Sequence, residues 1–361
     1  MGIFRSTDPT AWDDVDGIIV NESAPAPNVA GVAANVAILV GTSARGLPGL
    51  VEIGSIGEFH ELYGKSSSYG MNLALKNKKF GSLKVIRVTA AAAATATKAF
   101  ASSATDRISF TAKQGPGAYG NSITVTIEAG STAGKKYTII DTTSGGVMTQ
   151  EVYDNVEIAT AGTLLPFANS QLVTVAILSA AAEPSNAAAT ALASGSDGTV
   201  ADSDYQTAIA YAESEGAGNV LFLDSYNATR NGYLKLHAAA TADKMVIIAG
   251  AEGDSVATAI TDAASYRDTE GRIIYAYPWL ETSIDGVLTQ TNPASWYASI
   301  ISQTAPNVDP AFVKNSQFLA GVTALKRSLS RTNYISLAAA GISAFEFDSD
   351  IGFKVKSAVE I

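Results

Sequence analysis

Two glycine-containing stretches have residue types that could bind a phosphate group. GPGAYG (115–120) has the spaced glycines of a dinucleotide fingerprint, which works only where a strand leads into a helix whose N-terminus meets the pyrophosphate. The residues after it, NSITVTIE, alternate as a strand does, so we interpret the stretch as a turn. GKSS (64–67) resembles the end of a phosphate-binding loop, but Phe59 stands where that loop needs its first glycine. Neither stretch predicts a nucleotide site.

Two acidic stretches could bind a cation. In EFDSD, the carboxylates of Glu346, Asp348 and Asp350 occupy alternate positions, and three carboxylates can hold calcium. The stretch lacks the glycine and the terminal glutamate of an EF-hand loop, so we favour a solvated strand face. GSDG (195–198) could bind a cation or a phosphate through Asp197 and backbone amides, and the alternative is a turn at a unit boundary, which we favour.

The chain offers few residues for nucleophilic or metal chemistry. It has no cysteine, which excludes disulfides, thiolate catalysis and a cysteine-built zinc site. Its two histidines, His60 and His237, have no second histidine or acid at ligand spacing, so we expect structural roles. GTSARG (41–46) comes closest to a nucleophile elbow, but Arg45 replaces the second glycine. We therefore predict no catalytic residue, no cofactor-binding residue and no metal ligand, and hence that the protein is not an enzyme.

Composition favours a protein that packs against other copies of itself. Of 361 residues, 47% are hydrophobic and only 16% are charged, so much of the surface must be uncharged. A monomeric enzyme rich in alanine and glycine is the alternative. The net charge is −10, and KNKK (76–79) is the one basic cluster, which makes nucleic acid an unexpected partner. We expect no direct membrane insertion, because no apolar run reaches about 18 residues and no signal peptide is visible.

Hydrophobic periodicity predicts an α/β core with a mostly parallel sheet, interrupted by an inserted β-rich domain and preceded by an extended N-terminal arm. Apolar strands alternate with helical segments before residue 89 and again after residue 201, as in a sheet covered by helices on both faces. Short alternating strands fill the stretch between, and its alanine-, glycine- and serine-rich ends predict flexible boundaries. The predicted units are an N-terminal arm and strand (1–22), a discontinuous core (23–101 and 196–361) and the insertion (102–195).

The chain begins and ends with candidate strands. GIIVNE (17–22) is a short apolar strand after a polar arm, and from Phe353 onward apolar and polar residues alternate to the last residue, Ile361. Polar tails are the usual ends of a chain. An apolar end inside a strand is therefore unusual, and the family resemblance given next implies that the chain is cut within a longer protein.

Several segments in order resemble contractile-tail sheath proteins of tailed phages and related injection machines. The first resembles the sheath N-terminal signature: an arm strand, a proline-bearing linker, the first core strand and then RG and EF…YG. Tyr119 stands where the family often has tryptophan. The resembling segments are DGIIVNESAPAPNVAGVAANVAILVGTSARGLPGLVEIGSIGEFHELYG (16–64), FGSLKVIRV (80–88), GPGAYGNSITVTI (115–127), LASGSDGTVADSDYQTAI (192–209), YASIISQTAPNVDPAF (297–312) and LAAAGISAF (337–345).

The resemblance implies a structural subunit of a virion, assembled in the cytoplasm of the bacterial host. Such subunits form stacked hexameric rings around a tail tube and contract to drive the tube through a cell envelope. The implied partners are other copies, the tail tube protein, and the baseplate and tail terminator proteins, without a cofactor. An α/β enzyme or small-ligand-binding protein, using GSDG and the carboxylates near 346–350, remains the alternative. The candidate inter-subunit strand residues are Gly17, Ile18, Ile19, Val20, Phe353, Val355, Val359 and Ile361.

Overall fold

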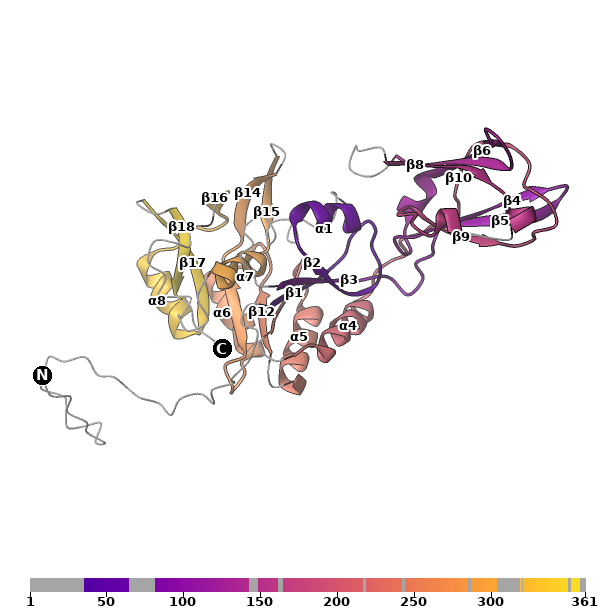
Figure 1. Cartoon of the computed structure of the whole chain (residues 1–361). Coiled ribbons are helices and arrows are strands. Elements are labelled where there is room, and N and C mark those ends of the chain that lie inside the picture. Colours follow the sequence, from indigo (N-terminus) through magenta and orange to yellow (C-terminus); the bar gives the residue numbers. More distant parts are fainter. Residues whose placement is uncertain are drawn as a thin grey trace, which may run out of the picture. The chain divides into compact units, whose positions relative to one another are not determined.

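The largest sheet in the described part of the chain has eight strands and forms the centre of an α/β unit (Figure 1). The computed structural model describes residues 36–64, 82–142, 149–161, 165–216, 219–241, 244–284, 287–303, 319, 321–349 and 352–357. The predicted N-terminal arm lies outside these residues. In spatial order the strands are β18 (Gly352–Ser357), β17 (Ile342–Asp348), β13 (Ile273–Tyr277), β12 (Met245–Ala249), β11 (Asn219–Leu223), β1 (Val36–Gly41), β3 (Ser82–Arg87) and β2 (Gly49–Ile53).

The central sheet is mixed. Parallel ladders join β17, β13, β12, β11, β1 and β3 in turn, whereas β18 and β2 are antiparallel strands at the two edges. The other three sheets of the described residues are antiparallel. The α/β class is therefore confirmed, but a mostly parallel sheet is not. At the β18 edge only three residues separate β17 from β18, and a short connection returns the chain antiparallel. At the other edge, β2 and β3 are separated by a longer stretch that contains an α-helix, Ile56–Tyr63.

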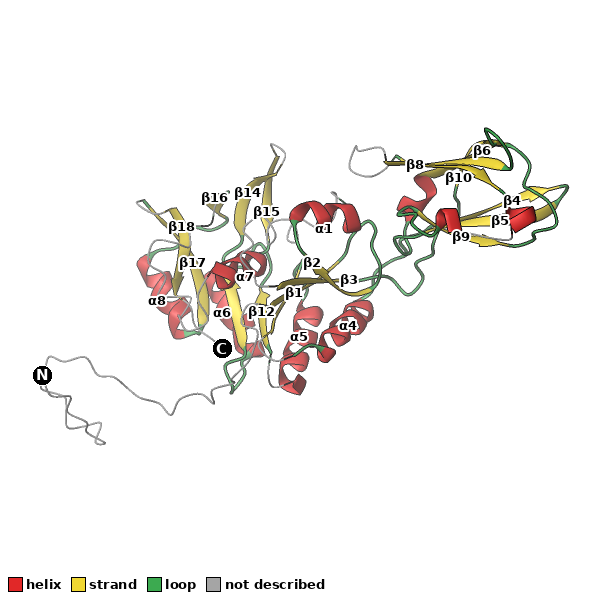
Figure 2. Ribbon diagram, viewed as in Figure 1, coloured by secondary structure: helices red, strands yellow, loops and turns green. Residues whose placement is uncertain are grey.

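Helices cover both faces of the sheet, and the strand residues divide between two cores (Figure 2). On β1, Ala37 and Leu39 face one core while Ile38 and Val40 face the other, as the period of two requires. None of the helices in the described ranges is long and apolar enough to cross a bilayer. The first core includes α1 (Ile56–Tyr63) and α7 (Pro293–Gln303), and the second α4 (Asp202–Ala210), α5 (Ala228–Thr241), α6 (Val256–Tyr266) and α8 (Arg331–Ala339).

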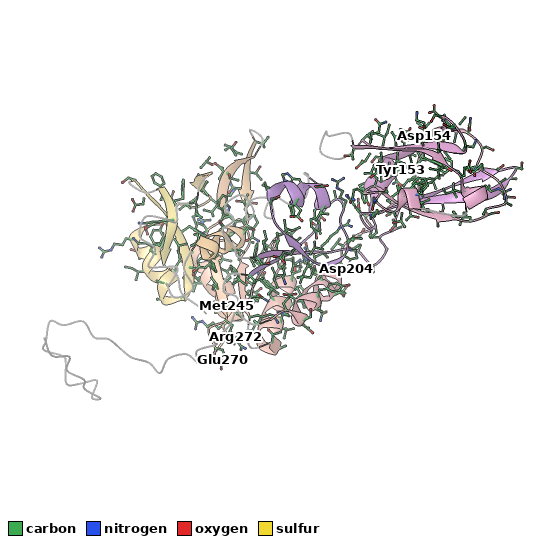
Figure 3. The ribbon with its side chains drawn as sticks, in the orientation of Figure 1. Tyr153, Asp154, Asp204, Met245, Glu270 and Arg272 are labelled. Carbon is green, nitrogen blue, oxygen red and sulfur yellow. The ribbon has the colours of Figure 1, made fainter. Side chains whose placement is uncertain are left out.

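A separate β-rich unit lies between β3 and α4 in sequence. A three-stranded and a four-stranded antiparallel sheet share one core, in which the rings of Phe110, Tyr137 and Phe167 lie 5.2–5.7 Å apart. Tyr153 and Asp154, labelled in Figure 3, lie in this β-rich unit. Glu270 and Arg272, labelled in the same figure, lie outside it, just before β13 in the sequence. The sheets contain β4 (Thr97–Ser102), β5 (Thr105–Ala112) and β9 (Val173–Ile177), and β10 (Ala187–Ala191), β6 (Ile123–Ala129), β7 (Lys135–Asp141) and β8 (Thr149–Val156).

A fourth, small sheet of the described residues follows β13 and was not predicted from the sequence. Its strand β14 (Leu280–Ile284) pairs with β15 (Val287–Thr291) on one side and with β16 (Val322–Leu325) on the other. Leu280 and Val322 join the same core as α1 and α7. The sheet therefore extends the covering of that face of the central sheet.

Candidate functional site

The C-terminal strand β18 forms an edge of the central sheet, next to β17. Its antiparallel register places Lys354 opposite Glu346 and Phe353 opposite Phe347. In the described part of the chain, no strand pairs with β18 on its other side. An edge strand carries a row of main-chain donors and acceptors that another strand can use. The sheet edge at β18 is therefore the candidate site that we describe.

Two of the predicted inter-subunit residues have their side chains placed on this strand. Phe353 is 9% exposed and belongs to the core beneath α7, and Val355 packs partly buried against the same core. The centroid of the Phe353 ring lies 4.9 Å from that of Phe347, which is 61% exposed. The other candidates, Gly17, Ile18, Ile19, Val20, Val359 and Ile361, lie outside the described residues, so their inter-subunit role stays a prediction.

The opposite face of the strand is an ion-paired face. The ammonium of Lys354 lies 2.6 Å from Asp348 and 3.5 Å from Glu346, and the ammonium of Lys356 lies 3.1 Å from Glu346. The hydrogen bond to Asp348, with the charge of Glu346, raises the pKa of Lys354. The lysines thus neutralise two of the three carboxylates of EFDSD, while Asp350 lies outside the described residues.

The described residues give no support to a calcium site at this strand. Among them, no three histidine, cysteine, aspartate or glutamate side chains form a group that could hold a metal ion. Lysine ammonium groups already lie where a cation would have to approach Glu346 and Asp348. The strand-face interpretation of EFDSD therefore fits the geometry, with the qualification that the face is ion-paired rather than fully solvated.

The carbonyl group of Phe353 points away from β17. The carbonyl oxygen of Phe353 accepts a hydrogen bond from the amide of Leu319 at 3.0 Å, a residue outside the β17–β18 pair. In an antiparallel strand the N–H and C=O of one residue point to the same side, and alternate residues share that side. By this alternation we expect Val355 to direct its main-chain groups to the same side, while Lys354 lies opposite Glu346 on β17. The register of the ladder shifts just beyond Val355, between Phe345 and Ala344. This arrangement can accept an added strand by main-chain hydrogen bonds.

The glycine-rich motifs have structural roles. GPGAYG leads into a short 3₁₀ turn and then β6, and Gly115 has a φ of +80°, so the turn interpretation is confirmed. In GSDG, the carboxylate of Asp197 accepts a hydrogen bond at 3.0 Å from the amide of Ala118, as a boundary turn would. Gly64 ends α1 with a φ of +87°, whereas the rest of GKSS lies outside the described residues. A left-handed φ favours glycine at Gly115 and at Gly64.

The two histidines lie on helices, away from the β17–β18 edge in sequence. His60 is on α1, where its ring meets the ring of Phe59 edge-on at 6.0 Å. His237 is 5% exposed on α5. Arg45 of GTSARG is also buried, and its guanidinium lies 3.1 Å from the carboxylate of Asp141. Each residue is placed by packing or by an ion pair of the fold.

Sequence reasoning missed one buried carboxylate, Asp224, at the carboxyl end of β11. This position adjoins the end of β1, where the strand order reverses and where open α/β sheets usually bind ligands. Its oxygens accept hydrogen bonds from the amide and hydroxyl of Thr42 at 3.1 and 3.3 Å, and from the hydroxyl of Tyr205 at 3.1 Å. A Cβ on Gly41 would lie 2.6 Å from Asp224. The chain's own groups therefore fill this position, which an aspartate directly after the apolar run NVLFL could have indicated.

Comparisons with known proteins place this chain by its fold. No family model matches the sequence, and no curated protein matches it. Among solved structures, the sheath tail protein Lin1278 from Listeria innocua is similar with a TM-score of 0.65 and 17% identity, over 90% of this chain and 68% of that one. The sheath tail protein DSY3957 from Desulfitobacterium hafniense gives 0.62 and 18%, over 91% and 71%. The chain shares the fold of these sheath tail proteins, as the sequence resemblance implied.

Proposed function

We propose that the chain is a structural subunit of a contractile tail sheath. The observation that carries this proposal is the fold shared with proteins named as sheath tail proteins, over most of the chain. The order of sequence segments that resemble the same family is a second, independent support. The candidate ligand motifs give the alternative little support, since Asp197, Asp224 and Glu346 are all engaged by groups of the chain itself.

In this function, copies of the chain form stacked hexameric rings around a tail tube. The sleeve starts extended and metastable, a baseplate signal releases it, and the rings move to a shorter and wider state that drives the tube through a cell envelope. Such a change needs a bistable interface between bodies that keep their own shape. The energy comes from assembly itself, without a nucleotide or a metal. The further partners are the tube, baseplate and tail terminator proteins, and the location is the virion, after assembly in the host cytoplasm.

The contacts between copies are proposed to be strand additions. The arm strand Gly17–Val20 of one copy adds to the β18 edge of another, where Val355 presents its main-chain groups. Each added hydrogen bond is worth only about 1 kcal/mol net. Because the same contact recurs in every ring, many such bonds act together along the sleeve. The lysines beside this edge, Lys354 and Lys356, keep the strand from pairing with unrelated edges.

Sedimentation velocity of the purified chain, with a melting-temperature screen, tests this function. We expect large species whose share grows with protein concentration, and a melting temperature that nucleotides and Ca²⁺ do not change. A monomer at every concentration whose melting temperature rises with one of these ligands would instead favour the enzyme or ligand-binding alternative, because a ligand that binds only the folded state stabilises it.

A further inference from the structure

The two chain segments that connect the core to the insertion pair with each other. Ala94 and Ser196 exchange main-chain hydrogen bonds of 2.8 and 2.9 Å, and Thr97 and Ala193 exchange bonds of 2.8 and 3.1 Å. The side-chain amide nitrogen of Asn121 donates to the carbonyl oxygen of Gly195, and its side-chain oxygen accepts from the amide of Gly195, each at 2.8 Å. The alanine- and serine-rich composition predicts flexible boundaries, whereas in the structure main-chain hydrogen bonds join the two segments. Alanine is depleted in strands, so main-chain hydrogen bonds rather than side-chain propensity hold this pairing.

A buried ion pair joins the same two parts of the chain at a second place. Arg45 lies in the loop after β1 of the core and Asp141 at the end of β7 in the insertion, 96 residues apart. Their side chains are 5% and 1% exposed, and the guanidinium nitrogen lies 3.1 Å from the carboxylate oxygen. A second nitrogen of Arg45 donates to the carbonyl of His60 on α1 at 3.3 Å. Breaking a buried pair leaves a buried charge without its partner, so this contact favours one geometry strongly.

A second buried arginine, Arg87 at the end of β3, forms a third connection. It is 4% exposed, and its guanidinium donates to the carbonyls of Gly46 at 2.6 Å and Ser43 at 3.2 Å in the core, and to that of Pro116 at 2.8 Å. Burial lowers the pKa of this guanidinium, so its charge relies on these dipoles. A planar guanidinium can serve three carbonyls at once, which an ammonium on a flexible stem does poorly.

The loops meet so closely that glycine is required where they touch. Gly46 donates its amide to the carbonyl of Gln114 at 2.8 Å. Gly115 has a φ of +80°, and a Cβ there would lie 2.4 Å from the carbonyl oxygen of Gly46. Both the backbone conformation and the space therefore exclude a larger residue at Gly115. The contact between these loops is part of the fold rather than a chance approach of two mobile surfaces.

We propose that these three connections lock the insertion to the core, so that the two move as one rigid body. Each connection uses a different part of the sequence: the paired segments, the Arg45–Asp141 ion pair, and the carbonyls bound by Arg87. The two arginine contacts join core residues to insertion residues, and the paired segments hold the two covalent links between these parts side by side. The lock is a property of the single chain and holds whether or not the chain assembles into a sleeve.

Spin-label distance measurements test the lock on the full chain. The chain has no cysteine, so Gln150→Cys on β8 and Ala239→Cys on α5, both exposed, give one label in each part. We expect a single narrow distance distribution in the otherwise unchanged chain. Asp141→Asn, which keeps the shape but removes the charge, and Arg87→Met should each broaden or shift it. Lys136→Gln, which removes the exposed ion pair with Glu128 inside the insertion, should leave it unchanged.

Two results would overturn the proposal. A broad distribution in the unchanged chain would show that the insertion moves freely on the core. A narrow distribution that both Asp141→Asn and Arg87→Met leave unaltered would show that these side chains do not hold it. Circular dichroism of each labelled variant checks that it is folded. Should Arg87→Met not fold, Asp141→Asn and the unchanged chain still decide the question.

Discussion

The ammonium of Lys354 lies 2.6 Å from the carboxylate of Asp348, across the pair of strands that forms one edge of the central sheet. The same ammonium lies 3.5 Å from Glu346. The charged side chains on this face therefore form ion pairs with one another. The main chain of the edge strand is what remains for a partner to bind, and we expect Val355 to direct its N–H and C=O outward.

Val355→Pro should prevent assembly while leaving the chain folded. Proline removes the N–H that the alternation of the strand directs away from β17, so we expect the pairing of Lys354 with Glu346 to remain. Val355→Ala, which shortens the side chain but keeps the N–H, is the matched control and should assemble. Sedimentation velocity measures assembly, and circular dichroism checks the fold. If Val355→Pro assembled as well as the alanine variant, the proposed strand addition at this edge would be wrong.

Deleting residues 1–20 should abolish assembly and leave the melting temperature of the core nearly unchanged. These residues include Ile18 and Val20, the apolar positions of the predicted arm strand, and they lie outside the described residues. Ile18→Asp with Val20→Asp should act as the deletion does, whereas Ser6→Asp in the polar part should not. A large fall in the melting temperature on deletion would indicate that the arm packs on its own core and would contradict strand exchange between copies.

Asp141→Ala should destabilise the chain strongly. It leaves the buried guanidinium of Arg45 without its carboxylate, and losing one partner of a buried pair costs about 3–5 kcal/mol. Lys136→Gln removes an ion pair whose side chains are 38% and 59% exposed, so its effect should stay within about 0.5 kcal/mol. Denaturant unfolding gives both values. Equal losses of unfolding free energy in the two variants would mean that the buried ion pair stabilises the fold no more than the exposed one does.

The stability of the chain should depend on pH through Asp262 of α6. Burial, followed by the charge of Asp254, raises the pKa of Asp262, although a hydrogen bond from Tyr275 at 2.8 Å opposes the shift. A raised pKa in the folded state means that folding is favoured below the unfolded-state pKa and loses this contribution as pH rises through the folded-state pKa.

Asp262→Asn keeps an acceptor for Tyr275 and removes the charge. We therefore expect this variant to lose less stability than the unchanged chain as pH rises from about 3.9, the usual aspartate pKa, to neutral. Asp106→Asn, at an exposed position of the insertion, is the control. Unfolding free energies measured across this pH range decide the matter. Parallel stability curves for Asp262→Asn and the unchanged chain would contradict the expected role of burial.

Replacing residues 102–195 by a short glycine/serine linker should leave a soluble core that still assembles. The insertion has its own core around Phe110 and Tyr137, and none of its described residues belongs to the two cores of the central sheet. The expected position of the insertion is the outside of the sleeve, away from the contacts between copies. Complete loss of soluble protein would show that the core cannot fold without it.

Elements with a clear period could be predicted from the sequence, and those without one could not. KKYTIID matches β7 (Lys135–Asp141), because its alternating residues face a core and solvent in turn. The helix IGEFHELY ends at Gly64 as expected. By contrast, β4 and β10 lie in alanine-rich stretches with no alternation, where pairing with neighbouring strands decides the structure.

The long-range contacts of the chain left no local signal. Arg45 and Asp141 are separated by 96 residues, and nothing beside either residue indicates the other. The hairpin of β14 and β15 follows Pro278 in a stretch whose residues Val287 and Leu288 are exposed, so its pattern does not mark a buried face. At the candidate site, the alternation of Phe353 and Val355 did predict a strand. Its position at the sheet edge follows from the topology of the whole sheet.

Electron microscopy of the purified chain is the most direct test of sheath assembly. Negatively stained wild-type protein should form tubes or stacks of rings with sixfold end views, and Val355→Pro at the same concentration should form neither. Discrete single particles of the wild-type chain at every concentration, with no rings or tubes, would contradict the proposed function.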